Sequence, residues 1–239
     1  LDLIDKYYHQ KNINKKLVKL NLKKVIDVGA HKGEFLTNAL STQKKLKVYS
    51  FEPQSEIFKK LKKKFKSRKN VFVYNKAISN VNMKKKLNIN LKTSTSTFSN
   101  YNKNSYWKKT KDFVLTGFKK SSIIRSELVQ SITLDNFCEK KKIKNIDLLK
   151  IDTEGYEYEV LKGASNFINK KKPEYIQIEY NWHHLFKNIN LYKISKLLVN
   201  YEVYKILPHS SGLLKIDPKR PENNYYNYSN YVFKLKKYV

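Results

Sequence analysis

The stretch Lys-Val-Ile-Asp-Val-Gly-Ala-His-Lys-Gly-Glu-Phe at residues 24–35 decides the fold of this chain of 239 residues. Its first half is rich in strand-forming residues, Gly29 and Gly33 follow, and a helical apolar pattern begins at Glu34. A strand, a glycine turn and a helix N-terminus in this order are typical of an α/β sheet that opens a crevice for a nucleotide-like ligand. The spacing is G-x-x-x-G, whereas a backbone that wraps a pyrophosphate has G-x-G-x-x-G. The stretch therefore favours a nucleoside ligand without a diphosphate.

An acidic residue follows the next strand pattern, at a spacing from the glycine turn that is typical of nucleoside-binding folds. Residues 47–51 form that pattern, and Glu52 follows it directly, 23 residues after Gly29. About 20 residues after the glycine turn is where such folds place an acid that holds ribose hydroxyls. A third strand pattern at residues 71–74 follows another helical segment. Strands that alternate with helices predict a parallel, doubly wound sheet with its ligand at the carboxyl ends of the strands.

Three carboxylates gather after a later apolar strand pattern at residues 146–151. They are Asp152, Glu154 and Glu157, and Gly155 lies among them. Helix capping and the helix dipole explain Glu157. We expect the other two carboxylates to converge on the crevice of the glycine turn, where they could serve as general base, as ligands of a hard metal ion or as partners of a cationic ligand.

Two adjacent histidines, His183 and His184, follow a strand pattern that ends at Glu179. Neighbouring residues seldom point at one metal ion, so metal ligation is not favoured. A single histidine that accepts a proton at the rim of the site is the preferred interpretation.

The remaining segments suggest a single domain with additions. An amphipathic pattern predicts a helical cover within residues 1–23, and residues 24–239 form the expected domain. Residues 82–132 interrupt the α/β pattern and predict an antiparallel insertion with a long loop that acts as a lid or binding loop. Near the C-terminus we expect a loop over residues 208–228 and a last strand at 231–235 that pairs antiparallel at the edge.

Charge and cysteine content narrow the function classes. The formal net charge is +30, from 50 Lys and Arg against 20 Asp and Glu. Such a charge can attract nucleic acid, but the lysines are spread along the chain and arginine, the usual phosphate reader, is scarce, which favours a compositional origin. No stretch is apolar and long enough for a transmembrane helix, and the first residues lack the apolar core of a signal peptide. The single cysteine, Cys138, excludes an internal disulfide and fits a reducing cytoplasm, where we expect this protein.

Several of these motifs together resemble the FkbM-type S-adenosylmethionine-dependent methyltransferases. They are D-V-G-A-H-K-G at 27–33, F-E-P at 51–53, T-L-D at 133–135, L-K-I-D-T-E-G-Y-E at 149–157 and V-L-K-G-A at 160–164. The resemblance runs from about residue 25 to 179, whereas residues 93–130 and those past 181 follow the family pattern poorly. It implies a class I methyltransferase fold, with a mostly parallel seven-stranded sheet whose last strand is antiparallel, and O-methylation of a hydroxyl.

The resemblance also implies the binding site for S-adenosylmethionine. Asp152 would lie beside the reacting methyl group, Glu52 at the ribose and Ala77 near the adenine. The amino-acid end of the cofactor would be held by Asp27, Gly29, Ala30 and Gly33. His31 and Pro53, within the same two segments, complete the expected cofactor-binding set.

These observations predict an O-methyltransferase that acts on a glycan, a nucleotide-sugar or another hydroxylated small molecule. Transfer is an in-line displacement, and the general base is one of Asp152, Glu154, His183 and His184. An RNA methyltransferase and a non-catalytic nucleoside-binding module remain as alternatives, and an NAD-dependent dehydrogenase is less favoured because the third glycine is absent. A divalent metal stays open as an additional cofactor but is not favoured.

Overall fold

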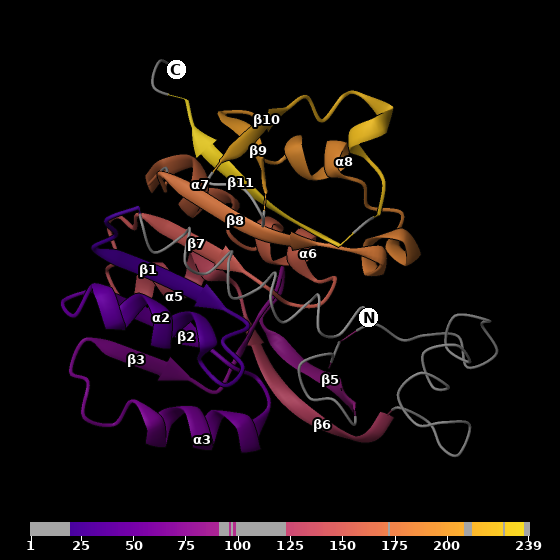
Figure 1. The fold of residues 1–239 in the computed structure, drawn as a ribbon. Helices are drawn as coiled ribbons and strands as arrows, with labels where there is room; N and C mark the ends of the chain where they lie inside the picture. The colour runs from indigo at the N-terminus through magenta and orange to yellow at the C-terminus, as the bar shows by residue number, and fades with distance from the viewer. Residues whose placement is uncertain are drawn as a thin grey trace.

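The computed structural model describes residues 20–90, 96, 98, 123–171, 173–207, 212–226 and 228–236. Its centre is an eight-stranded sheet with helices on both faces (Figure 1). The strands of this sheet are β1 (Lys24–Val28), β2 (Lys47–Phe51), β3 (Val71–Tyr74), β7 (Leu148–Ile151), β8 (Tyr175–Tyr180), β9 (Tyr201–Ile206), β10 (Leu213–Ile216) and β11 (Ser229–Leu235). The helices are α2 (Glu34–Thr42), α3 (Ser55–Lys64), α5 (Leu134–Lys140), α6 (Glu157–Lys162), α7 (Ser165–Lys171) and α8 (Leu191–Ser195), with 3-10 turns η2 (Trp182–Lys187) and η3 (Pro221–Asn223).

The strand order is β10-β9-β11-β8-β7-β1-β2-β3. Strands β3, β2, β1, β7 and β8 pair in parallel, whereas β11 is antiparallel to both β8 and β9. The predicted doubly wound, mostly parallel sheet with an antiparallel last strand is therefore confirmed. The sheet has eight strands where seven were expected, and β11 lies between β8 and β9, so its expected place at the edge is wrong.

Strand β10 is an addition at the edge of the sheet, where it pairs antiparallel with β9. It lies inside the segment 208–228 that we had interpreted as a loop, so that interpretation is wrong for residues 213–216. Leu213 and Leu214 are 42% and 51% exposed, so this strand buries neither of its faces. A strand that buries no face needs no alternation of apolar and polar residues, and the sequence therefore shows no sign of it.

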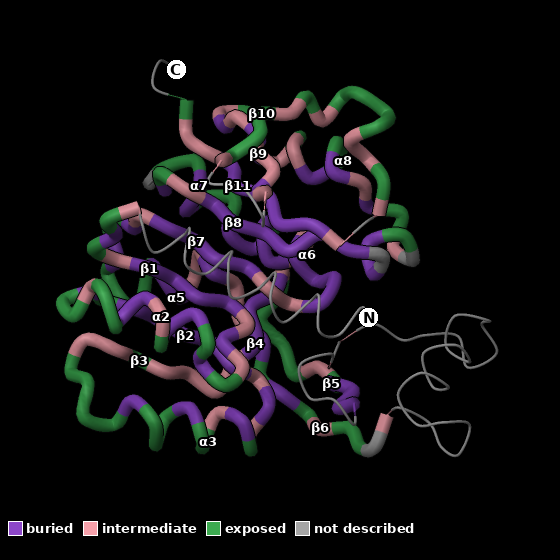
Figure 2. The backbone as a smooth tube through the Cα atoms, in the orientation of Figure 1, coloured by how far each residue is buried: buried purple, intermediate pink, exposed green. Residues whose placement is uncertain are grey.

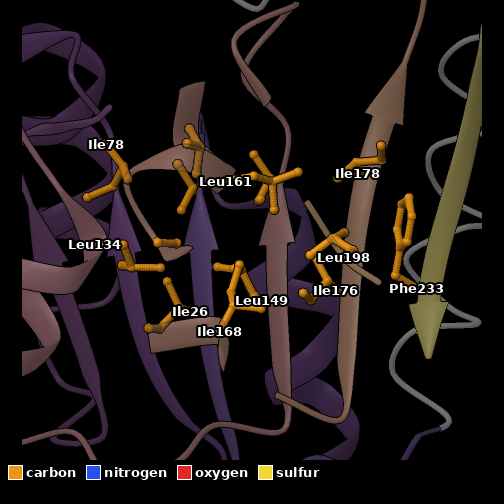
Figure 3. Packing of buried hydrophobic residues seen from close by; sticks show 14 of the residues in the cluster. Ile26, Ile78, Leu134, Leu149, Leu161, Ile168, Ile176, Ile178, Leu198 and Phe233 are labelled. Atoms are coloured by element: carbon orange, nitrogen blue, oxygen red, sulfur yellow. The ribbon is translucent and has the colours of Figure 1, made fainter. Parts of the chain in front are cut away.

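The two faces of the sheet bury different residues of the same strands. Ile26 of β1 packs toward α5, α6, α7 and α8, whereas Val25 packs toward α2 and α3. Figure 3 shows the first of these cores, in which Ile26, Leu149 and Ile176 from adjacent strands meet the helical Leu134 and Ile168. Side chains alternate between faces along a strand, so both faces of β1 are buried (Figure 2).

A second, three-stranded sheet lies beside the carboxyl ends of the main strands (Figure 1). It consists of β4 (Ala77–Ile78), β5 (Met83–Asn90) and β6 (Ile123–Ile132). β5 and β6 pair antiparallel, which confirms the predicted antiparallel insertion, and β4 joins them by pairing parallel with β6. The predicted lid loop lies largely outside the described residues, as does most of the predicted N-terminal helix.

Candidate active site

The glycine turn after β1 contacts the end of β7. Gly29 has a φ of +84°, and the amides of Gly29 and Ala30 both donate to the carbonyl oxygen of Phe51 at 3.0 Å. A Cβ at Gly29 would lie 1.9 Å from the carbonyl oxygen of Asp152, so no other residue fits between the two strand ends. The turn thereby joins two motifs that are far apart in the sequence.

Glu52 is held at the end of β2 by backbone amides. Its side chain accepts from the amide of His31 at 2.8 Å and from that of Gln54 at 2.9 Å. The side chain is only 2% exposed. Burial raises the pKa of Glu52 to about 7, against the opposing effect of the two amides and of the His31 ring. Near neutral pH its charge is therefore sensitive to what occupies the site.

Lys150 joins two carboxylates within the sheet. Its Nζ lies 3.3 Å from Asp27 Oδ1 and 3.3 Å from Asp152 Oδ2, and the lysine is 3% exposed. Lys150 stands opposite Asp27 in the pairing of β7 with β1, so both side chains point to the same face. Burial disfavours the ammonium, but the two carboxylates outweigh that and raise the pKa of Lys150 above its ordinary value. The buried lysine is thus charged and fixes the side chain of Asp152.

Glu154 forms an ion pair with His183. Glu154 Oε2 lies 3.3 Å from His183 Nε2, and both side chains are largely buried. The next residue, Gly155, has a φ of +89°, and a Cβ there would lie 2.4 Å from the Cβ of His183. Glycine at 155 therefore permits the histidine to reach the carboxylate.

Glu157 and His184 form a second pair, which is wholly enclosed. The atoms Glu157 Oε2 and His184 Nε2 lie 3.0 Å apart, and both side chains are 0% exposed. Glu157 Oε1 also accepts from the amide and the hydroxyl of Thr153 at 2.8 and 3.0 Å. Burial alone would raise the pKa of Glu157, but His184 and Thr153 hold it below its ordinary value.

A pocket opens at these strand ends and, with its mouth counted, contains about 570 Å³ of space. Its walls are both apolar and polar, as expected of a site for a small molecule. The residues that line it are Val28, Gly29, His31, Phe51, Glu52, Pro53, Gln54, Lys76, Ala77, Ile78, Leu87, Ser96, Phe98, Asp152, Thr153, Glu154 and Tyr156.

Most of the candidate residues from the sequence meet in this pocket. Those that line it are Gly29, His31, Glu52, Pro53, Ala77, Asp152 and Glu154. The others lie outside its lining and are Asp27, Ala30, Gly33, His183 and His184. His183 still contacts a lining residue, Glu154, whereas His184 is enclosed in the core with Glu157. His184 accordingly has no path to a substrate in this structure.

Sequence reasoning missed Lys150 and Tyr156. Lys150 was read as part of an apolar strand, although a charged residue in a central strand is itself a signal, because such a charge needs a partner. The register of β7 against β1 identifies that partner as Asp27. Tyr156 carried no signal, since its role as a lining residue depends on the fold of the loop between β7 and α6.

The described residues hold no group of three or more His, Cys, Asp or Glu side chains arranged to bind a metal ion. Within the same part of the chain, every helix is too short or too polar to cross a membrane.

The strand order, the antiparallel β11 and the pocket beside the glycine turn define a class I methyltransferase, whose cofactor is S-adenosylmethionine. The model of the methyltransferase FkbM domain matches residues 27–206, most of the chain. The chain belongs to the FkbM methyltransferase family, as its motifs predicted.

Solved structures with a similar fold are distant in sequence. The N-methyltransferase NodS from Bradyrhizobium japonicum WM9 is 8% identical, with 99% of this chain and 100% of that chain covered and a TM-score of 0.49. A putative caffeoyl-CoA O-methyltransferase from Staphylococcus aureus is 9% identical, with 95% and 83% covered and a TM-score of 0.48. Precorrin-6y C5,15-methyltransferase from Geobacter metallireducens GS-15 is 12% identical, with 92% and 86% covered and a TM-score of 0.42. Their names differ in the atom that is methylated, and at this similarity none of them bears on the acceptor of this chain. A search of curated proteins found no match.

Proposed function

We propose that this methyltransferase transfers a methyl group to a hydroxyl of a glycan, a nucleotide-sugar or another hydroxylated small molecule. The observation that supports this most is that two carboxylates, Asp152 and Glu154, line the same pocket as Gly29 and Glu52. A hydroxyl holds its proton at neutral pH and needs a base as its oxygen attacks, and carboxylates suit that role.

The residues at the strand ends fit S-adenosylmethionine. When bound, this cofactor supplies an electrophilic methyl group on a sulfonium ion. Glu52 would accept from the ribose hydroxyls, because it lines the pocket and each amide contact leaves a carboxylate lone pair available. Gly29 would leave room for the amino-acid end, and Ala77 would lie near the adenine.

Glu154 is the proposed general base, supported by His183. As the acceptor oxygen bonds to the methyl carbon, the bond from that carbon to sulfur would break with its electron pair left on sulfur, and Glu154 would take the proton released from the hydroxyl. His183 at 3.3 Å orients the carboxylate and stabilises its charge before the transfer. His183 is thus a positioning residue in this proposal.

Asp152 would provide a fixed negative charge beside the sulfonium. Lys150 lies 3.3 Å from both Asp27 and Asp152 and orients the side chain of Asp152, whereas burial raises the pKa of Asp27. A fixed carboxylate that needs no reorganisation contributes by positioning and by electrostatics.

A screen of hydroxylated acceptors tests this proposal, with the mass gain of one methyl group as the readout. The panel would contain sugars, nucleotide-sugars and amine analogues of the same sugars. We expect transfer to hydroxyls that is roughly 100-fold slower in Glu154→Gln and unchanged in the control Glu159→Gln, whose carboxylate pairs with Lys187 and does not line the pocket. Transfer to the amines alone would overturn the proposal.

The net charge of +30 supports a second candidate, an RNA methyltransferase. In that case RNA would be retained with a steep dependence on salt concentration and would itself gain methyl groups. Retention without methylation would assign the charge to nonspecific attraction. The cytoplasmic location expected from the sequence stays a prediction.

A further inference from the structure

Behind one lining residue of the pocket, Tyr156, an amino group and a hydroxyl from two other segments meet its phenol. Lys85 of β5 donates from Nζ to the hydroxyl of Tyr156 at 2.5 Å and to Oγ of Ser79 at 2.9 Å. Tyr156 lines the pocket, and Ser79, directly after β4, is fully buried. The hydroxyls of Tyr156 and Ser79 lie 3.5 Å apart. The three groups therefore form one polar cluster, which reaches the pocket lining through Tyr156.

The charge of this cluster is not neutralised by the described residues. Both hydrogen-bond partners of Lys85 are neutral oxygens, and no carboxylate in the described part of the chain forms an ion pair with it. A neighbouring cation differs: Lys187 Nζ lies 4.1 Å from the ring centroid of Tyr156, and it pairs with Glu159 at 3.4 Å. A partly buried ammonium with neutral partners only has lost water without gaining a counter-charge, which favours an anionic ligand.

The position of Lys85 separates it from the many surface lysines. Side chains alternate along β5, so Lys85 shares a face with Leu87, which lines the pocket. Lys84 and Lys86 point to the other face and are exposed, whereas Lys85 is half-buried. The lysine content of the chain alone does not account for a half-buried cation on the pocket side of the strand.

We propose that Lys85 and Tyr156 bind an anionic group of the acceptor, a carboxylate or a phosphate. The acceptor class would then be a sugar acid or a sugar phosphate, free or within a glycan; this assignment of the acceptor rests on the proposed O-methyl transfer, whereas the anion site rests on the contacts alone. Lys85 retains a third N–H, which donates to an anionic oxygen in a charge-assisted hydrogen bond. Tyr156 lies two residues after Glu154, and both line the pocket, so the anion is held at the end of the pocket where the hydroxyl is activated.

Binding of three matched probes tests this site. Glucose, glucuronate and glucose 6-phosphate share their ring hydroxyls and differ at C6, and their affinities would be measured by ligand-observed NMR in the presence of S-adenosylhomocysteine. We expect at least one of the two anions to bind about tenfold more tightly than glucose, because its charge strengthens the hydrogen bond from Lys85; this ratio corresponds to about 1.4 kcal/mol. The two anions separate a carboxylate site from a phosphate site.

Substitutions within β5 provide matched controls. Lys85→Met keeps the aliphatic stem and should reduce the affinity for the anion to that for glucose. Lys85→Arg should retain the preference, and Lys84→Met, on the exposed face, should leave it unchanged. Circular dichroism checks folding, and Tyr156→Phe, which removes only the hydroxyl, makes the same test if Lys85→Met does not fold.

Three results would overturn the anion site: equal affinities for the three probes, no detectable binding of either anion, or equal effects of Lys84→Met and Lys85→Met. Equal methylation rates of the more tightly bound anion, at concentrations below saturation, by the wild type and by Lys85→Met would also overturn it, while leaving the proposed O-methyl transfer intact. Conversely, anion selectivity that depends on Lys85 would support the site even if methyl transfer proved to be specific for amines.

Discussion

Two pairs of a glutamate and a histidine lie side by side in this molecule, and they have different surroundings. Glu154 lines the pocket and pairs with His183, whereas Glu157 and His184 are wholly enclosed. The glutamates are three residues apart and the histidines are adjacent, so the chemistry of the two pairs is the same and only their location differs. Access to the pocket, and not the type of residue, therefore separates a candidate catalytic pair from a structural one.

The local backbone explains the difference. Glu154 has a φ of +53° and precedes Gly155, so its side chain leaves the strand end toward the pocket. Glu157 is the first residue of α6, and its carboxylate accepts from the amide of Thr153 within the same loop. One turn of chain thus directs one carboxylate into the pocket and the other into the protein interior.

The largest effect should come from breaking the enclosed pair. Glu157→Gln leaves His184 without its carboxylate and removes a buried charge interaction, so we expect the free energy of unfolding to fall by about 3 kcal/mol. Because the pKa of Glu157 is held below its ordinary value, the stabilisation is present above that value and is lost as the pH falls through the lowered pKa. Urea denaturation at several pH values measures both effects. A stability equal to that of the wild type would show that the enclosed pair contributes nothing.

The same substitution in the pocket pair should have the opposite signature. We expect Glu154→Gln to change the free energy of unfolding by less than about 1 kcal/mol and to slow methyl transfer roughly 100-fold, within the range for loss of a general base. Single-turnover kinetics at saturating cofactor measures the chemical step. If Glu154→Gln and Glu157→Gln both reduce stability and neither changes the turnover of the folded enzyme, the distinction between the pairs fails.

The sequence was informative where function depends on the ends of parallel strands. Gly29, Glu52 and Asp152 each follow an apolar strand pattern, and the carboxyl ends of parallel strands share one edge of the sheet. Their meeting in one pocket follows from that rule and from the parallel pairing of β1 with β2 and β7.

The sequence was uninformative where a contact depends on register or on loop conformation. His183 and His184 are adjacent, and only the fold of η2 directs each to a different glutamate. Similarly, Lys85 and Tyr156 are 71 residues apart and meet because the small sheet packs beside α6. No periodicity in the sequence carries this information.

A smaller catalytic effect is expected at Asp152, whose partner is a lysine in place of a histidine. Asp152→Asn removes the charge and keeps the shape, so cofactor binding should be retained while methyl transfer becomes at least about tenfold slower. Lys150 then has only Asp27 as its anionic partner. Calorimetry of cofactor binding and single-turnover kinetics separate the two steps. Unchanged turnover would remove Asp152 from the reaction and leave Glu154 as the one carboxylate with a catalytic role.

Glu52 extends the comparison to a buried carboxylate whose hydrogen-bond donors are backbone amides. Glu157 pairs with His184, and its pKa is lowered. Among the described residues Glu52 has no such pair at its carboxylate, and burial raises its pKa to about 7. Ribose hydroxyls donate to the ionised carboxylate, so we expect cofactor affinity to rise with pH through this value and to be about tenfold weaker near pH 6 than near pH 8. The His31 ring acts on Glu52 in the opposite direction and lowers the pKa of the carboxyl.

Calorimetry across this pH range measures the change in affinity, and repeating it in buffers of different ionisation enthalpy counts the protons released on binding. Glu52→Gln cannot ionise, so its affinity for S-adenosylhomocysteine should be lower than that of the wild type above pH 7 and should depend little on pH. His31→Gln serves as the control, because it removes the other titratable ring at the turn and leaves the carboxylate. The opposite result, in which Glu52→Gln retains the full pH dependence and His31→Gln abolishes it, would contradict this prediction. Glu52 would then be ionised over the whole pH range, although in the described part of the chain only backbone amides donate to it.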